Sequence, residues 1–228
     1  EYWKRYSPQL FVTASHATQF NLEMPFGKGL IVSGNNRFYA LDKKQFREFT
    51  TFLRGVLFNV NEDDLLSFLK RIKAPVIETR PVPAVWVAAG NCLIGDAKKT
   101  KNSMAVTALS RYGFNQLVGY TVPSWYGKGG WGTLGLLFSN HDASSLAEAW
   151  YLNNQFILDE TMIRFPKLMD VHFNSPDING IKNDPDFARG MNSAGYGMGK
   201  DQLGLIHDRD TVAFYGDPAW TARLDESR

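Results

Sequence analysis

The sequence predicts an α/β fold in which a mostly parallel sheet lies between helices. The first observation is an uncharged run at 84–89, which contains two Val residues and a Trp and is typical of a strand buried on both faces. The second is the order strand, helix, strand over 84–121, a βαβ unit whose two strands run parallel. The third is another apolar run, 10–14, that ends in polar residues as the first one does. We therefore expect three parallel strands in one sheet.

Composition narrows the class of protein. With 228 residues, 44% of them hydrophobic, the chain is long enough to bury a real core. The 25 basic and 23 acidic residues leave a net charge of only +2, which gives nucleic-acid binding no electrostatic basis. No window approaches the roughly 18 apolar residues of a membrane span. One cysteine permits neither an internal disulfide nor a cysteine-based metal site.

The remaining elements follow from apolar spacing and from turn residues. A hairpin is expected at 30–41, turning at Gly34-Asn35-Asn36, and Asp42 is expected to cap the helix after it. We expect helices at 43–58, 63–72, 103–112 and 144–163, strands at 116–121, 203–206 and 211–215, an aromatic, glycine-rich loop at 123–132, and no regular element at 174–200.

A thiol and an imidazole follow two of the predicted parallel strands. Cys92 comes directly after Gly90 and Asn91, which break the strand 84–89, and His16 follows the strand 10–14. The carboxyl ends of parallel strands meet at one edge, where ligands bind in open α/β sheets. A thiol needs a neighbouring imidazole or dipole to become a good nucleophile near neutral pH. The sequence therefore favours a Cys92–His16 dyad, the alternative being a cysteine that only fills the core.

The other histidines and a glycine-rich motif predict no further catalytic, metal or cofactor site. His141 is expected to help cap a helix, and His172 and His207 to lie at the surface or at a strand edge. No pair of histidines has metal-ligand spacing, so we expect no metal site. The segment Gly127–Gly132 matches G-x-G-x-x-G but does not directly follow a strand, so no dinucleotide is expected.

Three segments carry a resemblance to a known family. Gly90–Asp96 resembles the nucleophile segment of the gingipain-type family of caspase-like cysteine peptidases. Gly119–Gly127 resembles that family's pocket-forming strand and loop, and Phe214–Pro218 is similar to its closing strand. The order strand–His, strand–Cys, helix, strand also resembles that of the family.

The resemblance implies a caspase-like three-layer sandwich that cleaves peptide bonds through an acyl-enzyme. Cys92 would be the nucleophile and His16 the general acid/base, with the backbone N–H groups of Cys92 and Ala17 forming the oxyanion hole. No cofactor would take part in the chemistry, a structural calcium ion is allowed, and a secreted or cell-surface bacterial protein is favoured. The substrate pocket would be formed by Thr121, Val122, Trp125 and Tyr126.

The resemblance also implies a domain organisation. Residues 1–228 would form a single caspase-like catalytic domain, with 29–72 inserted as a hairpin plus helices between the His and Cys strands. The sequence departs from the family because Ser15 and Ala17, rather than glycines, flank the histidine. The family also has further strands before the first strand found here. We expect an upstream segment or a partner chain to complete the sheet.

Two other functions remain open at this point. A non-catalytic relative would be a binding or scaffolding module that kept the fold. A thiol transpeptidase or amidase would use the same dyad but differ in what accepts the acyl group.

Overall fold

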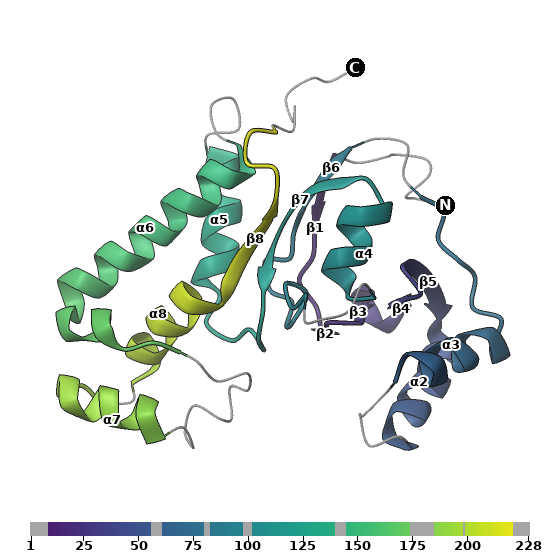
Figure 1. Cartoon of the computed structure of the whole chain (residues 1–228), viewed down its shortest axis with the longest axis horizontal. Helices are drawn as coiled ribbons and strands as arrows, with labels where there is room; N and C mark the ends of the chain where they lie inside the picture. The colour runs from purple at the N-terminus through teal and green to yellow at the C-terminus, as the bar shows by residue number, and fades with distance from the viewer. Residues whose placement is uncertain are drawn as a thin grey trace.

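The structure is a computed structural model of the chain and describes residues 9–55, 61–79, 83–97, 102–139, 145–173, 185–197 and 199–220. The described residues form an α/β fold with a mixed, mostly parallel sheet and a second, antiparallel sheet (Figure 1). The first sheet has the order β1-β6-β7-β8, with the strands β1 Leu10–Val12, β6 Ala84–Val87, β7 Phe114–Tyr120 and β8 Val212–Gly216. The expected α/β fold with a mostly parallel sheet is confirmed.

The three predicted parallel strands are neighbours in this sheet. β1 pairs with β6 in parallel, with Leu10 opposite Val85, and β6 pairs with β7 in parallel. β8 is antiparallel to β7. All four residues of β6 are buried, as expected for a strand without charges. Within the described part of the chain β1 lies at one edge of the sheet.

Helices cover both faces of the first sheet (Figure 1). On one face Trp86 and Phe114 pack in a core with Met104 and Ala108 of the helix α4 (Met104–Arg111). On the other face Val85 and Val87 pack against two helices. These are α5 (Lys128–Ser139) and α6 (Leu146–Arg164). Neighbouring residues of β6 thus enter different cores, because successive side chains of a strand point to opposite faces.

The segment between β1 and β6 forms the second sheet and two helices. The sheet has the order β2-β3-β4-β5, with β2 Ala17–Thr18, β3 Asn21–Glu23, β4 Gly29–Gly34 and β5 Arg37–Asp42. The predicted hairpin is confirmed as β4 and β5. Asn35 and Asn36 have φ of 49° and 51°, the left-handed conformation that a tight hairpin turn requires. A short 3₁₀ helix, Pro25–Gly27, lies before β4, and α2 (Lys43–Gly55) and α3 (Glu62–Arg71) follow β5.

Three elements differ from the predicted ones. The loop expected at 123–132 becomes a helix, α5, from Lys128 onward. The segment 174–200 contains the helix α7 (Pro185–Ala194), while 174–184 and 198 lie outside the described residues. The strand expected at 203–206 is part of the helix α8 (Lys200–Thr211), which leads into β8. A second 3₁₀ helix, Pro166–Asp170, connects α6 with the following segment.

Close packing explains why the helix α5 contains so many glycines. A Cβ at Gly130 would overlap the backbone of Ala89, and one at Gly129 would overlap the side chain of Val212. A Cβ at Gly132 would overlap the Asn153 amide on α6. Glycine lowers intrinsic helix propensity by about 1 kcal/mol per residue. Here it permits contact with the sheet on one side and with α6 on the other.

Candidate active site

The ends of β1 and β6 bring the chain segments that hold His16 and Cys92 to the same edge of the sheet. The parallel pairing continues past the strands, since the Thr13 N–H donates to the Val87 carbonyl over 3.0 Å. Cys92 is half-buried and His16 is exposed. Among the residues that the structure describes, no side chain forms a hydrogen bond or an ion pair with the His16 imidazole.

Asn91 links the two segments. Its amide Nδ2 donates to the carbonyl of Ser15 over 2.8 Å, and its Oδ1 accepts from the Thr13 hydroxyl. The Asn91 side chain is fully buried, so these bonds are shielded from water. The residue directly before the cysteine is therefore bonded to the residue directly before the histidine.

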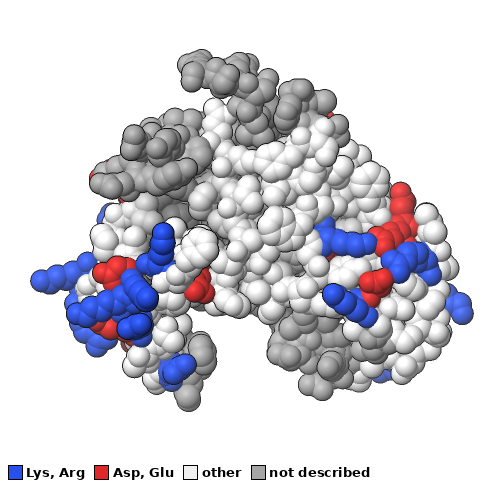
Figure 2. All heavy atoms as spheres, turned by 180° about the vertical axis from the view of Figure 1, so that it is seen from behind, with Lys and Arg blue, Asp and Glu red and all other residues white. Residues whose placement is uncertain are grey.

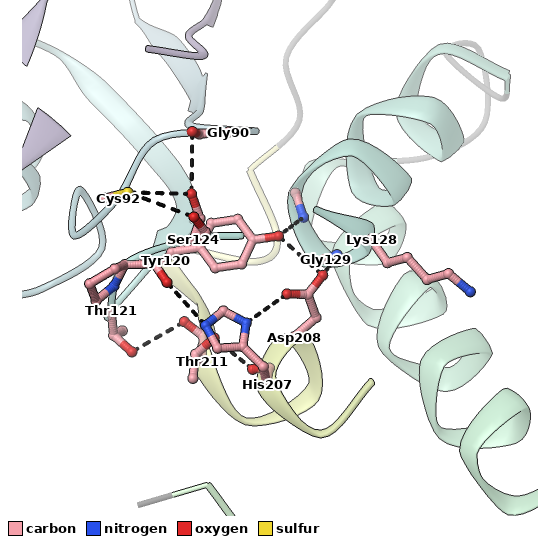
Figure 3. A network of polar contacts seen from close by, with 12 residues as sticks. Gly90, Cys92, Tyr120, Thr121, Ser124, Lys128, Gly129, His207, Asp208 and Thr211 are labelled. Atoms are coloured by element: carbon pink, nitrogen blue, oxygen red, sulfur yellow. Dashed lines mark hydrogen bonds and ion pairs between the residues drawn. The ribbon is translucent and has the colours of Figure 1, made fainter. Parts of the chain in front are cut away.

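The thiol of Cys92 faces the loop that leaves β7. Its Sγ lies 3.7 Å from the Ser124 hydroxyl and 3.8 Å from the Ser124 carbonyl (Figure 3). Ser124 in turn donates from its hydroxyl to the carbonyl of Gly90 over 3.3 Å. Ser124 is a neighbour of the thiol that the sequence did not single out. Its place in the first residues after a buried parallel strand was the one signal that could have identified it.

The chain turns sharply after the cysteine. Leu93 has φ of 58°, a left-handed conformation that is uncommon for a residue with a large side chain. The Leu93 N–H donates to the carbonyl of Val122 over 3.2 Å, and Gly95 N–H donates to the carbonyl of Tyr120 over 2.9 Å. Strained backbone of this kind persists only where surrounding contacts enforce it, and it is concentrated at functional sites. The two hydrogen bonds fix the Cys92 segment against β7 and its loop.

The four predicted pocket residues have different surroundings. Val122 is buried in a separate apolar cluster with Leu168 and Ile206. Thr121 bonds through its hydroxyl and its N–H to the carbonyl of Thr211. The remaining two are the aromatic residues of the loop: Trp125 packs on Tyr126 and His207, and Tyr126 lines a hollow between α5 and α6. Ala17, the predicted second oxyanion residue, is buried at the start of β2.

A buried histidine lies behind the loop that carries Ser124. The sequence placed His207 at the surface or at a strand edge, which is wrong, because its side chain is fully buried on α8. Its Nε2 lies 3.1 Å from the carbonyl of Pro123, and its Nδ1 lies 2.9 Å from Oδ1 of Asp208 (Figure 3). A carbonyl can only accept a hydrogen bond, so Nε2 is the donor in the contact with Pro123.

Asp208 extends this network to α5. Its Oδ2 accepts from the Gly129 N–H over 2.8 Å and from the Tyr120 hydroxyl over 3.2 Å (Figure 3). Burial, followed by the nearby Asp208 carboxylate, raises the pKa of Tyr120 well above its usual range, so this phenol stays a hydrogen-bond donor. The rings of Tyr120, Trp125 and Phe173 surround His207. This network therefore fixes the positions of the Ser124 loop, α8 and the start of α5 relative to one another.

Further charged side chains lie at the surface. Figure 2 shows basic and acidic side chains side by side over two opposite ends of the molecule, with a broad uncharged area between them. At one end Glu160 pairs with Lys128 and with Arg164, and Arg164 pairs with Asp201. The hydroxyl of Tyr126 donates to Asp201 over 3.1 Å. Burial and then this acceptor raise the pKa of Tyr126 to about 12, so it is neutral at physiological pH.

The sequence assigns minor roles to two further histidines and predicts no metal site. His172 is exposed, as expected, and His141 lies outside the described residues. The part of the chain that the structure describes contains no group of three or more His, Cys, Asp or Glu side chains that could hold a metal ion. Within the same residues, no helix is both long and apolar enough to cross a membrane.

Comparison with known proteins adds no relative to this description. No family model matches the chain, and no curated protein and no solved structure matches it either.

Proposed function

We propose that the chain is a cysteine endopeptidase of the caspase-like, gingipain-type kind, with Cys92 as nucleophile and His16 as general acid/base. The observation that carries the proposal is the bond between Asn91 and Ser15, because it joins the backbone directly before the thiol to the backbone directly before the imidazole. The half-buried thiol beside a polar loop and the left-handed turn at Leu93 support it.

In this proposal the thiol of Cys92 gives its proton to the His16 imidazole, and the sulfur attacks the carbonyl carbon of the substrate. The backbone N–H groups of Cys92 and Ala17 stabilise the oxyanion that forms. His16 then protonates the leaving amine as the C–N bond breaks, which leaves a thioester on Cys92. Water hydrolyses the thioester and restores the thiol. His16 is exposed, so its imidazole is accessible to a bound peptide.

The outer edge of the first sheet is where an upstream segment or a partner chain was expected to add strands. β1 is the last strand on its side of the first sheet within the described residues. Exposed strand edges present unpaired N–H and C=O groups, which proteins usually cover. Our expectation that an upstream segment or a partner chain adds strands here stays a prediction.

The proposal is tested with an electrophilic peptide and a peptide library. The unmodified chain should be alkylated at Cys92 and should cleave peptides, while Cys92→Ala should lose both, with at least about a 10⁴-fold fall in kcat/KM. His16→Gln should lose cleavage to a similar degree. His172→Gln is the matched control, since it removes an exposed imidazole elsewhere. The unfolding free energy of Cys92→Ala should change by about 1 kcal/mol or less, because the thiol makes only long contacts with Ser124.

The other outcomes separate the alternatives. Peptide binding without alkylation or cleavage would indicate a binding or scaffolding module. Transfer of the acyl group to an added amine in preference to water would indicate a transpeptidase. A Cys92→Ala variant that no longer folds would indicate a cysteine that only fills the core.

A further inference from the structure

A shallow hollow of about 520 Å³ opens between the first turns of α5 and the second half of α6. Its walls are aromatic: Tyr126 from the loop before α5, Trp131 from α5 and Phe156 from α6. Asn153 also lines it but is occupied, because its amide donates to the carbonyls of Lys128 and Gly129. The free surface of the hollow is thus mainly aromatic carbon.

Two of these aromatic side chains are exposed to water. Trp131 is 49% exposed and Phe156 is 56% exposed, although both are large apolar residues. Single exposed apolar residues are common, but several around one concave surface usually mark a binding site. The hollow therefore has the character of a site for an apolar group.

The hollow adjoins the edge of the sheet that carries Cys92. A Cβ built on Gly90 would lie 3.4 Å from Nε1 of Trp131, so the indole lies against the turn that follows β6. Gly90 is two residues before Cys92, and their Cα atoms are at most about 8 Å apart because each peptide unit spans 3.8 Å. An extended peptide held at Cys92 advances by about 3.3 Å per residue. A side chain within two or three residues of the reacting bond can therefore reach Trp131.

The charges at the rim of the hollow neutralise one another. Lys128 and Glu160 line it and pair with each other, and Glu160 also pairs with Arg164. Asp201 then balances Arg164 over 2.6 Å. A charged substrate side chain would have to break one of these pairs to gain a partner. The hollow thus offers no free charge for recognition of a basic or acidic side chain.

We propose that this hollow is a subsite for a large apolar side chain, aromatic or long aliphatic, within two or three residues of the bond that is cleaved. The proposal rests on the proposed peptidase function. It adds the class of substrate, namely peptides with an uncharged, bulky residue near the cleavage point.

The test shortens two aromatic side chains of α6 to alanine, one inside the hollow and one outside it. Phe156→Ala should lower the preference for Phe over Ala in the substrate, measured as a ratio of kcat/KM values, by roughly tenfold. Tyr151→Ala is the control and should leave the ratio within about twofold, because Tyr151 is 57% exposed on α6 but does not line the hollow. Phe156→Leu should restore most of the preference.

A second measurement does not depend on cleavage. The indole N–H resonance of Trp131, assigned with Trp131→Phe, should shift when an uncleavable Phe-containing peptide is added to the intact chain. An Ala-containing peptide should cause a smaller shift, and Phe156→Ala should weaken the saturation. Cleavage with no apolar preference and no shift of Trp131 would overturn the subsite alone. A saturable shift without any cleavage would overturn the peptidase and keep the hollow as an apolar binding site.

Discussion

The amide of Asn91 bonds in two directions at once, and the candidate dyad depends on both bonds. The Asn91 carbonyl accepts from Thr13, and its NH₂ group donates to the carbonyl of Ser15. The Thr13 hydroxyl also accepts from the indole of Trp86 over 2.8 Å. Because the amide is buried, loss of either bond leaves a polar group without water to replace it.

We expect Asn91→Ala to lower the free energy of unfolding by about 1–3 kcal/mol, because it leaves the Ser15 carbonyl and the Thr13 hydroxyl with fewer partners. Urea denaturation measures this change. Asn192→Ala, at an exposed position on α7, should change the value by about 0.5 kcal/mol or less. Equal stability of the two variants would show that Asn91 does not hold the segments together.

At the scale of residues, sequence reasoning identified the segments that hold the thiol and the imidazole but not their surroundings. Cys92 and His16 stand out because each follows a strand, and strand ends are readable from apolar runs. Ser124 and His207 do not stand out, since their roles depend on which loop faces which helix. His207 follows Leu205 and Ile206 in a short apolar run, and such a run does not distinguish a strand from a buried helix.

At the scale of elements, α5 shows why local propensity can predict the wrong element. Four of its twelve residues are glycines, Gly129, Gly130, Gly132 and Gly135, a composition typical of a loop. Contacts with Ala89 after β6, with β8 and with α6 require a backbone without side chains at three of them, and those contacts are made only after folding. By contrast, β6 was predictable because its burial on both faces leaves a continuous apolar run.

Two glycines of α5 should respond to alanine in opposite directions. Gly130→Ala should lower the free energy of unfolding by about 1–3 kcal/mol, because its Cβ would overlap the Ala89 backbone, which cannot move aside as a side chain could. Gly135→Ala should raise it by up to about 1 kcal/mol, because no atom lies within 4 Å of the added Cβ and alanine favours the helix. Urea denaturation of both variants checks the signs. A stabilised Gly130→Ala would contradict the close contact with the Ala89 backbone.

At the scale of the whole molecule, ion pairs join helices that are far apart in the sequence. Glu160 on α6 connects to Lys128 at the start of α5, and Arg164 connects α6 to Asp201 on α8. The loop before α5 contacts α8 through Tyr126, whose hydroxyl donates to Asp201. The sequence predicted the parallel strands but neither the antiparallel direction of β8 nor the second sheet beyond its hairpin. Those features depend on pairings between distant segments, which leave no local pattern.

The Glu160 pairs should make stability depend on pH. The hydrogen bond from Lys128, helped by Arg164, holds the pKa of Glu160 below its usual 4.5. A carboxyl group whose pKa is lowered by folding stabilises the fold above the unfolded value, and that contribution is lost as the pH falls through the folded value. The stability advantage of the unmodified chain over Glu160→Gln, about 1 kcal/mol or less at pH 6, should therefore shrink as the pH falls below 4.5.

Urea denaturation at pH 6, 4 and 3 measures that advantage. Asp159→Asn is the control, because Asp159 is exposed on the same helix and forms no ion pair with the described residues. An advantage that stays constant over this range would show that Glu160 gains nothing from its partners in the fold.

The enclosed pair of His207 and Asp208 also sets a limit on exchange with water. The Nε2 N–H of His207 donates to the carbonyl of Pro123, and the side chains of His207 and Asp208 are fully buried. The proton on Nε2 can be replaced by a deuteron only when α8 separates from β7 and from the Ser124 loop. The lifetime of this proton thus reports how often α8 moves away from the loop that faces the thiol.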